Sequence, residues 1–436
     1  MGPCLKKFAF ILTLSAAAMS FPGAARAGED MGIREAIALT LERNAVLLSL
    51  RQELPKASAF KLQADGALTP EIGFSAGIDE NRETQTSDGS DRYDRRNARL
   101  TLSQNIYSGG RNQALRRQSA QVRSIAERNL KDAENRAVGE LFARFYNVLL
   151  QERRAETERS AISASEVHLR EVTRMSELGL SNRLEVIRAS QQLAANRANL
   201  STAEGAHDSA VISLMNYMSI PPAKRRPVSG DLRALEIEGG RETSLDAARE
   251  NRADLGALSD QIEYQKNQIE IERSALRPHI NLGASAAVMN PYSGMDSTDD
   301  TWRAELTITV PILDRSSSKG NVLRARAIAE QNRISFEQRE LDIESGVETA
   351  WTEMETASNH LEAASAALEL AEETLRLAEV GFQEGVTPQL DLLSAQTSLT
   401  ESRLEYLRSL YNRLLAVVAI KVTEGNIIEW AEEMEF

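Results

Sequence analysis

The 436-residue chain is long enough for two or three ordinary domains or for one elongated domain. Aromatic residues make up only 5% of it, and its abundance of Ala, Leu, Glu, Arg and Gln is typical of long helices. The formal net charge of −13 disfavours nucleic acid as a partner. No stretch after residue 27 approaches the roughly 18 consecutive apolar residues of a transmembrane helix.

Residues 1–27 are predicted to be a secretory signal peptide. Lys6 and Lys7 supply its positive start, residues 8–18 its short apolar stretch, and Ala25–Ala27 a small-x-small cleavage site. Cys4, the only cysteine, lies ahead of the apolar stretch, so we expect no lipid anchor at the cleavage site. Cleavage removes three positive charges from the net charge of −13, which leaves a cysteine-free mature chain at −16.

The rest of the chain contains an internal duplication with an offset of about 206 residues. Three pairs of segments match in the same order: 69–76 with 277–284, 98–102 with 304–308, and 179–186 with 385–392. Matches of this kind indicate a repeated architecture. The expected divisions are a first repeat over 28–220, a linker over 221–244, a second repeat over 245–422 and a tail over 423–436.

Each repeat is expected to begin with a helical segment, Ile33–Ala64 or Leu245–Leu276, that ends shortly before a proline. Apolar and polar residues then alternate in two runs per repeat, which predicts strands with one apolar face. The resulting hairpins are expected over 70–107 and 278–312, with polar loops at Glu80–Arg96 and Asn290–Thr301. Their strands, about ten residues long, have the length of tilted transmembrane strands.

A very long helix is predicted after each hairpin, over Arg111–Leu178 in the first repeat and from about Asn321 to Val380 in the second. Roughly 65 helical residues form a rod about 100 Å long. Each rod is expected to end at glycines and to be followed by a return helix, so that the helical hairpins cover 111–218 and 321–422. Spacings of three and four residues predict coiled-coil packing along a seam of Leu361, Ala364, Leu368, Ala371, Leu375, Ala378 and Phe382.

Four membrane-length strands cannot close by themselves, because the smallest membrane barrels have eight strands. Lipid also does not tolerate open strand edges, so the chain is expected to oligomerise. Three copies would give a twelve-stranded transmembrane β-barrel, although two or four copies would also close. The fold class is therefore mixed α and β, with the β-barrel continued by a long α-helical coiled-coil barrel in the periplasm.

Two segments carry a family resemblance. Residues 102–111, Leu-Ser-Gln-Asn-Ile-Tyr-Ser-Gly-Gly-Arg, resemble the strand-to-helix junction of TolC-like outer-membrane factors. Residues 385–396 resemble the glycine tip and the Leu-Asp-Leu-Leu run of the same family. The resemblance covers nearly the whole mature chain. It implies a homotrimeric exit duct, in contact with outer-membrane lipid, that docks onto a periplasmic adaptor and an inner-membrane pump of the RND or ABC type.

The resemblance also assigns candidate sites. The helix tips, where adaptors would engage, correspond to Arg174, Leu178, Gly179, Leu180, Ser181, Gly381, Gly385, Val386 and Thr387. In the family, carboxylates one helical turn apart narrow the pore just beyond the second tip. Asp391 matches the first of them, whereas the second position is occupied by Ser394. A ring of three Asp391 carboxylates would favour cations, and the alternative for Asp391 is an ordinary solvated helix residue.

No enzyme is predicted, because the sequence contains no nucleotide-binding, metalloprotease or nucleophile-elbow motif. Its four histidines are scattered, so they are expected at the surface, and neither a metal site nor a cofactor is predicted. The alternative function is a soluble periplasmic coiled-coil adaptor or spacer protein, although such a protein usually has only one helical hairpin. The cargo, whether drug, metal ion or polypeptide, is left open.

Overall fold

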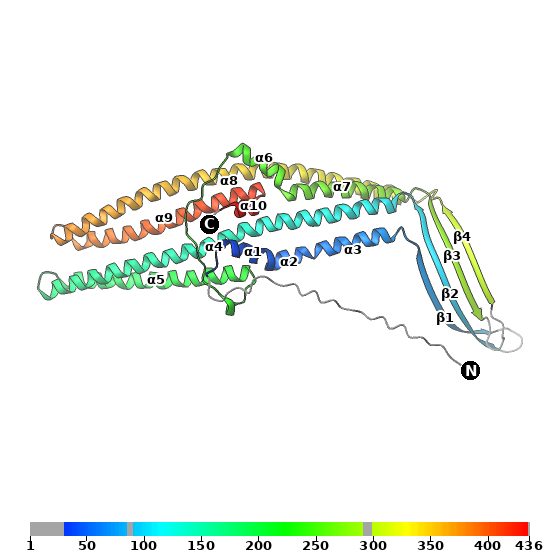
Figure 1. Cartoon of the computed structure of the whole chain (residues 1–436), viewed down its shortest axis with the longest axis horizontal. Helices are drawn as coiled ribbons and strands as arrows, with labels where there is room; N and C mark the ends of the chain where they lie inside the picture. The colour runs from blue at the N-terminus through cyan, green and yellow to red at the C-terminus, as the bar shows by residue number, and fades with distance from the viewer. Residues whose placement is uncertain (1–29, 85–89, 291–298, 435–436) are drawn as a thin grey trace.

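The computed structural model describes residues 30–84, 90–290 and 299–434, so the predicted signal peptide lies outside the described residues. The molecule is elongated, with a sheet at one end and paired helices running away from it to two tips at the other (Figure 1). No helix in the described ranges has both the length and the apolar character needed to cross a bilayer.

The helical segment predicted before each hairpin is present, but it is interrupted in both repeats. The first repeat has α1 (Ile33–Arg43), α2 (Ala45–Arg51) and α3 (Glu53–Gly66). Asn44 causes the first break, because its side-chain oxygen accepts hydrogen bonds from the backbone of Val46 and Leu47 and so caps α2. The second repeat has α6 (Arg241–Asn251) and α7 (Ala253–Ser274), with the break at Arg252.

The two hairpins join in one antiparallel sheet of β1 (Glu71–Thr84), β2 (Ser90–Ser108), β3 (His279–Asn290) and β4 (Asp299–Thr309). The strand order is β1-β2-β3-β4, so β2 and β3 join the repeats. The predicted loop at Glu80–Arg96 is wrong for most of its length, because β1 and β2 stay paired out to Thr84 and Ser90. Strand β4 ends before Pro311, which has no N–H for the ladder.

The sheet has one apolar and one polar face. The pairs Ile72–Leu102, Phe74–Leu100, Leu282–Leu306 and Ala286–Trp302 lie on one face, and Phe74, Leu306 and Trp302 are 73%, 62% and 82% exposed. The intervening residues, which point to the opposite face, include Ser75, Arg99, Thr101, Ser285, Arg303 and Glu305. An exposed apolar face on a four-stranded sheet requires a cover other than water.

Long helices leave the sheet in both repeats. α4 (Arg111–Glu177) and α8 (Ser317–Gln383) have 67 residues each, which corresponds to about 100 Å. They pair with the return helices α5 (Arg183–Tyr217) and α9 (Gln389–Glu424) (Figure 1). The predicted seam of α8 is confirmed at Ala364 and Ala371, which are buried while most of their neighbours along the helix are exposed.

The main apolar core lies midway along the helices. Phe142, Phe145, Leu214, Leu414 and Ile427 are among its fully buried members. The segment between the repeats contains the short 3-10 helix η1 (Pro222–Lys224) and crosses this region, and the tail forms α10 (Ile427–Glu433), which also packs here. The linker and the tail therefore complete the core, whereas the helices toward the tips meet mainly as pairs.

A half-buried ion cluster locks the break between α6 and α7 to α8. The carboxylate of Asp254 accepts hydrogen bonds from Arg252 at 2.7 Å and from Arg339 of α8 at 2.8 Å. Burial alone would raise the pKa of Asp254, but the hydrogen bonds from the two arginines outweigh it and lower that pKa to about 2. Because of this lowered pKa, the stabilisation that the ion cluster provides depends on pH.

Because the folded-state pKa lies below the ordinary value of 3.8, the contact stabilises the protein above about pH 4 and is lost as the pH falls toward 2. Asp254→Asn is expected to lower the free energy of unfolding at pH 7 by about 2 kcal/mol. Thermal unfolding of the purified full chain checks this between pH 7 and pH 2. The difference in unfolding midpoint between wild type and variant should become smaller as the pH falls. A difference that stays constant with pH would contradict the lowered pKa of Asp254.

Candidate functional site

The first tip closes with a hydrogen-bonded glycine turn. Gly179 adopts a φ of 73°, which favours glycine, and the backbone N–H of Leu180 donates to the carbonyl of Met175 at 2.8 Å. Leu178 and Leu180 are 65% and 77% exposed, and Arg174 is exposed beside them. The turn therefore presents two leucines and an arginine to the outside.

Ser181 lies at the start of the return helix α5. Its hydroxyl donates to the carboxylate of Glu185, and the side-chain oxygen of Asn182 accepts from the Glu185 backbone N–H at 3.0 Å. Asn182 thus caps the helix, and Ser181 holds the Glu185 side chain beside this cap.

The second tip is tighter than the first. Gly385 has a φ of 75°, and the backbone N–H groups of Val386 and Thr387 both donate to the carbonyl of Gly381, at 2.8 and 3.0 Å. A Cβ atom on Gly381 would collide with the side chain of Thr387, so this glycine is required by packing. Val386 is 77% exposed at the apex. The predicted tip residues thus lie in two turns and in the helix ends beside them. The two turns lie at the same end of the molecule (Figure 1).

A contact that the sequence did not predict ties the two helical hairpins together near the tips. The side-chain nitrogen of Gln389, at the start of α9, donates to the carbonyl of Glu185 at 2.9 Å and lies 3.2 Å from Nε2 of His168 in α4. His168 is only 4% exposed and packs edge-on against Phe382, so the expectation of a surface histidine is wrong at this position. Burial lowers the pKa of His168, which Glu171 partly offsets. Nothing in the local sequence distinguishes Gln389, because its partners are distant in the chain.

Asp391 and Ser394 lie on the same exposed face of α9, at the end near the tips. Exposed positions continue on this face at 398, 401, 405, 408 and 412, the three- and four-residue spacing of one helical face. The opposite face of α9 contributes Leu410, Leu414 and Val417 to the apolar core. The Asp391 face is therefore the side of the helix layer that turns away from the core.

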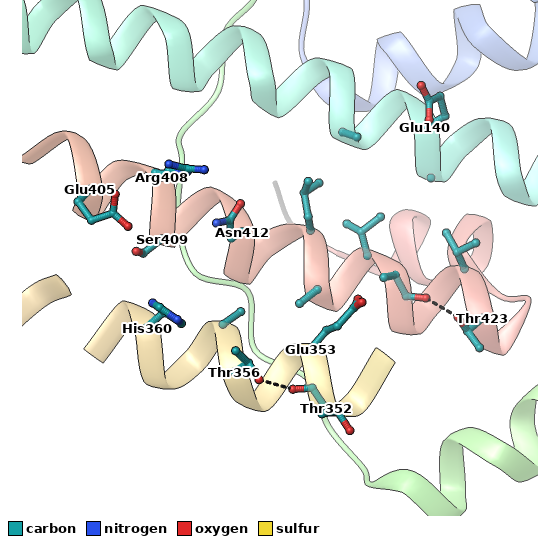
Figure 2. A pocket seen from close by; sticks show the side chains of 18 residues that line it. Glu140, Thr352, Glu353, Thr356, His360, Glu405, Arg408, Ser409, Asn412 and Thr423 are labelled. Atoms are coloured by element: carbon teal, nitrogen blue, oxygen red, sulfur yellow. Dashed lines mark hydrogen bonds between the residues drawn. The ribbon is translucent and has the colours of Figure 1, made fainter. Parts of the chain in front are cut away.

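Farther along α9 this face borders a groove of about 900 Å³ between α4, α8 and α9. Figure 2 shows Glu405, Arg408 and Asn412 of α9 beside Glu353 and His360 of α8. Apolar residues including Ala143, Ala416 and Val422 also line it. The groove therefore has a mixed polar and apolar lining, and it opens on the same side of α9 as Asp391.

The described ranges contain no group of three or more His, Cys, Asp or Glu side chains placed to bind a metal ion. The candidate sites are three surfaces: the two exposed tips, the exposed face of α9 with its groove, and the sheet with its two dissimilar faces.

Comparison with known proteins gives a family match over both repeats. Residues 36–219 and 244–426 match the family described as outer membrane efflux protein. Protein CyaE of Bordetella pertussis is 25% identical over 406 residues, which cover 90% of this chain and 84% of that protein. The two matched stretches of the family coincide with the duplicated halves of the chain.

Solved structures share the fold. The CmeC outer membrane channel of Campylobacter jejuni superposes with a TM-score of 0.81 at 15% identity, over 92% of this chain and 88% of that one. The open state of the MtrE outer membrane channel of Neisseria gonorrhoeae gives a TM-score of 0.77 at 19% identity, over 90% of this chain and 88% of that one. The arrangement of sheet, long helices and tips is therefore common to these chains.

Proposed function

This chain belongs to the outer membrane efflux protein family, and on that premise we propose that three copies form one passive exit duct. The protein is an outer-membrane efflux channel with a periplasmic helical extension. The observation that carries the proposal is the two-faced sheet, whose outer strands β1 and β4 each pair on one side only within the described chain. The apolar face fits lipid and the polar face fits a water-filled pore.

Closure of the sheet supports the trimer. Four strands are too few for a membrane barrel, and unpaired strand edges are not tolerated in lipid, so β4 of one copy would pair with β1 of the next. Three copies give twelve strands. The helices that leave each sheet would then continue the wall on the periplasmic side, with the Asp391 face of α9 toward the lumen and the apolar core toward the outside.

The tips are proposed as the docking surface for a periplasmic adaptor. Exposed leucines and a valine at the two apices, with Arg174 beside them, support this role because an interface needs apolar contact and a polar rim. An inner-membrane pump, of the RND or ABC type, would supply the energy and select the cargo. The duct itself would carry out no chemistry and bind no nucleic acid.

Asp391 is proposed to narrow and polarise the periplasmic end. Three copies would contribute three carboxylates at one level of the lumen, which favours cations. Ser394, on the same face of α9, adds no charge, so the ring would contain half the carboxylates of the family pattern with two acidic positions.

Single-channel recording of the purified full chain in planar bilayers tests the proposal. Wild type is expected to open discrete, cation-preferring channels. Asp391→Asn should lower the cation-to-anion permeability ratio by about twofold or more, while Ser394→Asp should raise it, because each changes the ring by three charges. Channels with unchanged selectivity in both variants would remove Asp391 from the pore lining, and the absence of any channel would contradict the duct itself.

A further inference from the structure

Glu158 of α4 is buried, and one of its two carboxylate oxygens has no hydrogen-bond partner within the described chain. Its side chain is 5% exposed, and its Oε2 atom makes no hydrogen bond within the described chain. Burial raises the pKa of Glu158, and Arg154 one turn earlier only partly offsets this. A buried acceptor without a donor is costly, so such a group calls for a partner that the chain itself does not supply.

The carboxylate borders a cavity of about 260 Å³ between the hairpin of α4 and α5 and the hairpin of α8 and α9. Gln396 of α9 also lines this cavity, and its side-chain oxygen is buried without a partner as well. Two unmatched acceptors, one charged and one neutral, therefore come from opposite hairpins. The cavity is large enough for a small organic molecule.

Several donors around the cavity are already used. The side-chain nitrogen of Asn196 donates to Ser165 at 2.8 Å and to the carbonyl of Ala161 at 3.3 Å. Arg403, the cation on the wall, donates to Glu372 of α8 at 3.1 Å. The remaining wall includes the apolar side chains Leu375, Leu399 and Leu404. The cavity thus combines an acceptor-rich part with an apolar part.

We propose that this cavity binds small primary amines as their ammonium ions. An ammonium carries three N–H donors and a positive charge, which match the Glu158 carboxylate and the Gln396 oxygen. A short alkyl chain on the amine would lie against the leucines. A bare divalent metal fits less well, because the described residues offer no cluster of three ligating side chains here.

The site goes beyond passive conduction, because its two acceptors lie on different helical hairpins. Glu158 belongs to α4 and Gln396 to α9, in the part of the molecule where the apolar core no longer joins the hairpins. A bound ammonium would hold the hairpins together on the side of the core nearer the tips. The ligand is therefore expected to stabilise the helical part against thermal unfolding.

The test is calorimetric titration of the purified full chain in detergent with n-butylammonium, repeated with n-butyltrimethylammonium. The two ions share charge and alkyl chain, but the second has no N–H donor. Saturable binding of the primary amine alone, with a higher unfolding midpoint, is expected. Equal binding of both ions, or binding of neither, would overturn the proposal.

Variants locate the site. Glu158→Gln should weaken n-butylammonium binding tenfold or more, whereas Glu152→Gln, an exposed glutamate on the same helix, should leave it unchanged. Gln396→Leu removes the second acceptor at similar size and should weaken binding several-fold, which provides an independent test if Glu158→Gln fails to fold. Unchanged affinity in either folded variant would show that the amine binds elsewhere.

Discussion

Leu306→Arg is expected to abolish recovery of the protein in the outer membrane. Leu306 lies on the apolar face of β4, opposite Leu282, and is 62% exposed. An arginine on the lipid face of a membrane strand costs about 2–4 kcal/mol near the midplane, and a trimer would incur this cost three times. Membrane fractionation followed by detergent extraction measures the loss.

Thr307→Arg is the matched control for this variant. It introduces the same side chain one residue further along β4, where the side chain points to the polar face that already carries Arg303 and Glu305. The control protein is expected to reach the outer membrane at near wild-type levels. Equal loss of both variants would mean that the two faces of the sheet are not divided between lipid and pore.

Gly109→Ala is expected to destabilise the junction between β2 and α4 by about 3 kcal/mol or more. Gly109 has a φ of 65°, and a Cβ atom there would lie 2.6 Å from the backbone oxygen of Ser274 and 2.9 Å from Cβ of Arg277. The left-handed backbone costs an alanine about 1–3 kcal/mol, and the collision adds a similar amount because a backbone atom cannot turn aside. Arg277 also donates to the carbonyl of Gly109 at 2.9 Å, so displacement would break this bond.

Gly179→Ala separates the two contributions. Gly179 at the first tip has a similar φ of 73°, but no atom lies within 4 Å of the position its Cβ would take. Its substitution is expected to cost only the backbone part, about 1–3 kcal/mol. Thermal unfolding of both variants measures the difference between their midpoints. Equal midpoints would show that the collision of the new Cβ atom at position 109 with the Ser274 oxygen costs no stability.

The sequence predicted most of the secondary structure because its signals are local and periodic. Alternation along residues 71–79 and 99–107 identified strands, and uninterrupted helix-forming residues identified α4 and α8. The prediction was wrong in a polar segment. The segment Glu80–Arg96 was expected to be a loop because it is polar, yet β1 and β2 continue into it because each strand satisfies the hydrogen bonds of the other.

Some residues of the candidate sites could be identified from the sequence and others could not. The glycine turns at both tips could be identified from sequence, because a positive φ selects glycine locally. Asp391 could also be identified from the sequence. The role of Asp391 in the pore and the role of the tips in docking an adaptor stay predictions. The Gln389–His168 tie could not be identified, because its partners lie 221 residues apart and belong to different repeats.

The sequence by itself determined the repeated plan, the strands, the long helices and their glycine turns, since each depends on periodicity or on the conformation of a few adjacent residues. Only the tertiary structure decided that β2 and β3 join the repeats in one sheet and that His168 is buried. It also decided that Glu158 and Gln396 border one cavity and that each has one buried oxygen without a hydrogen-bond partner in the described chain. Burial and hydrogen-bond satisfaction depend on which distant helices pack together, and no local pattern of residues carries that information.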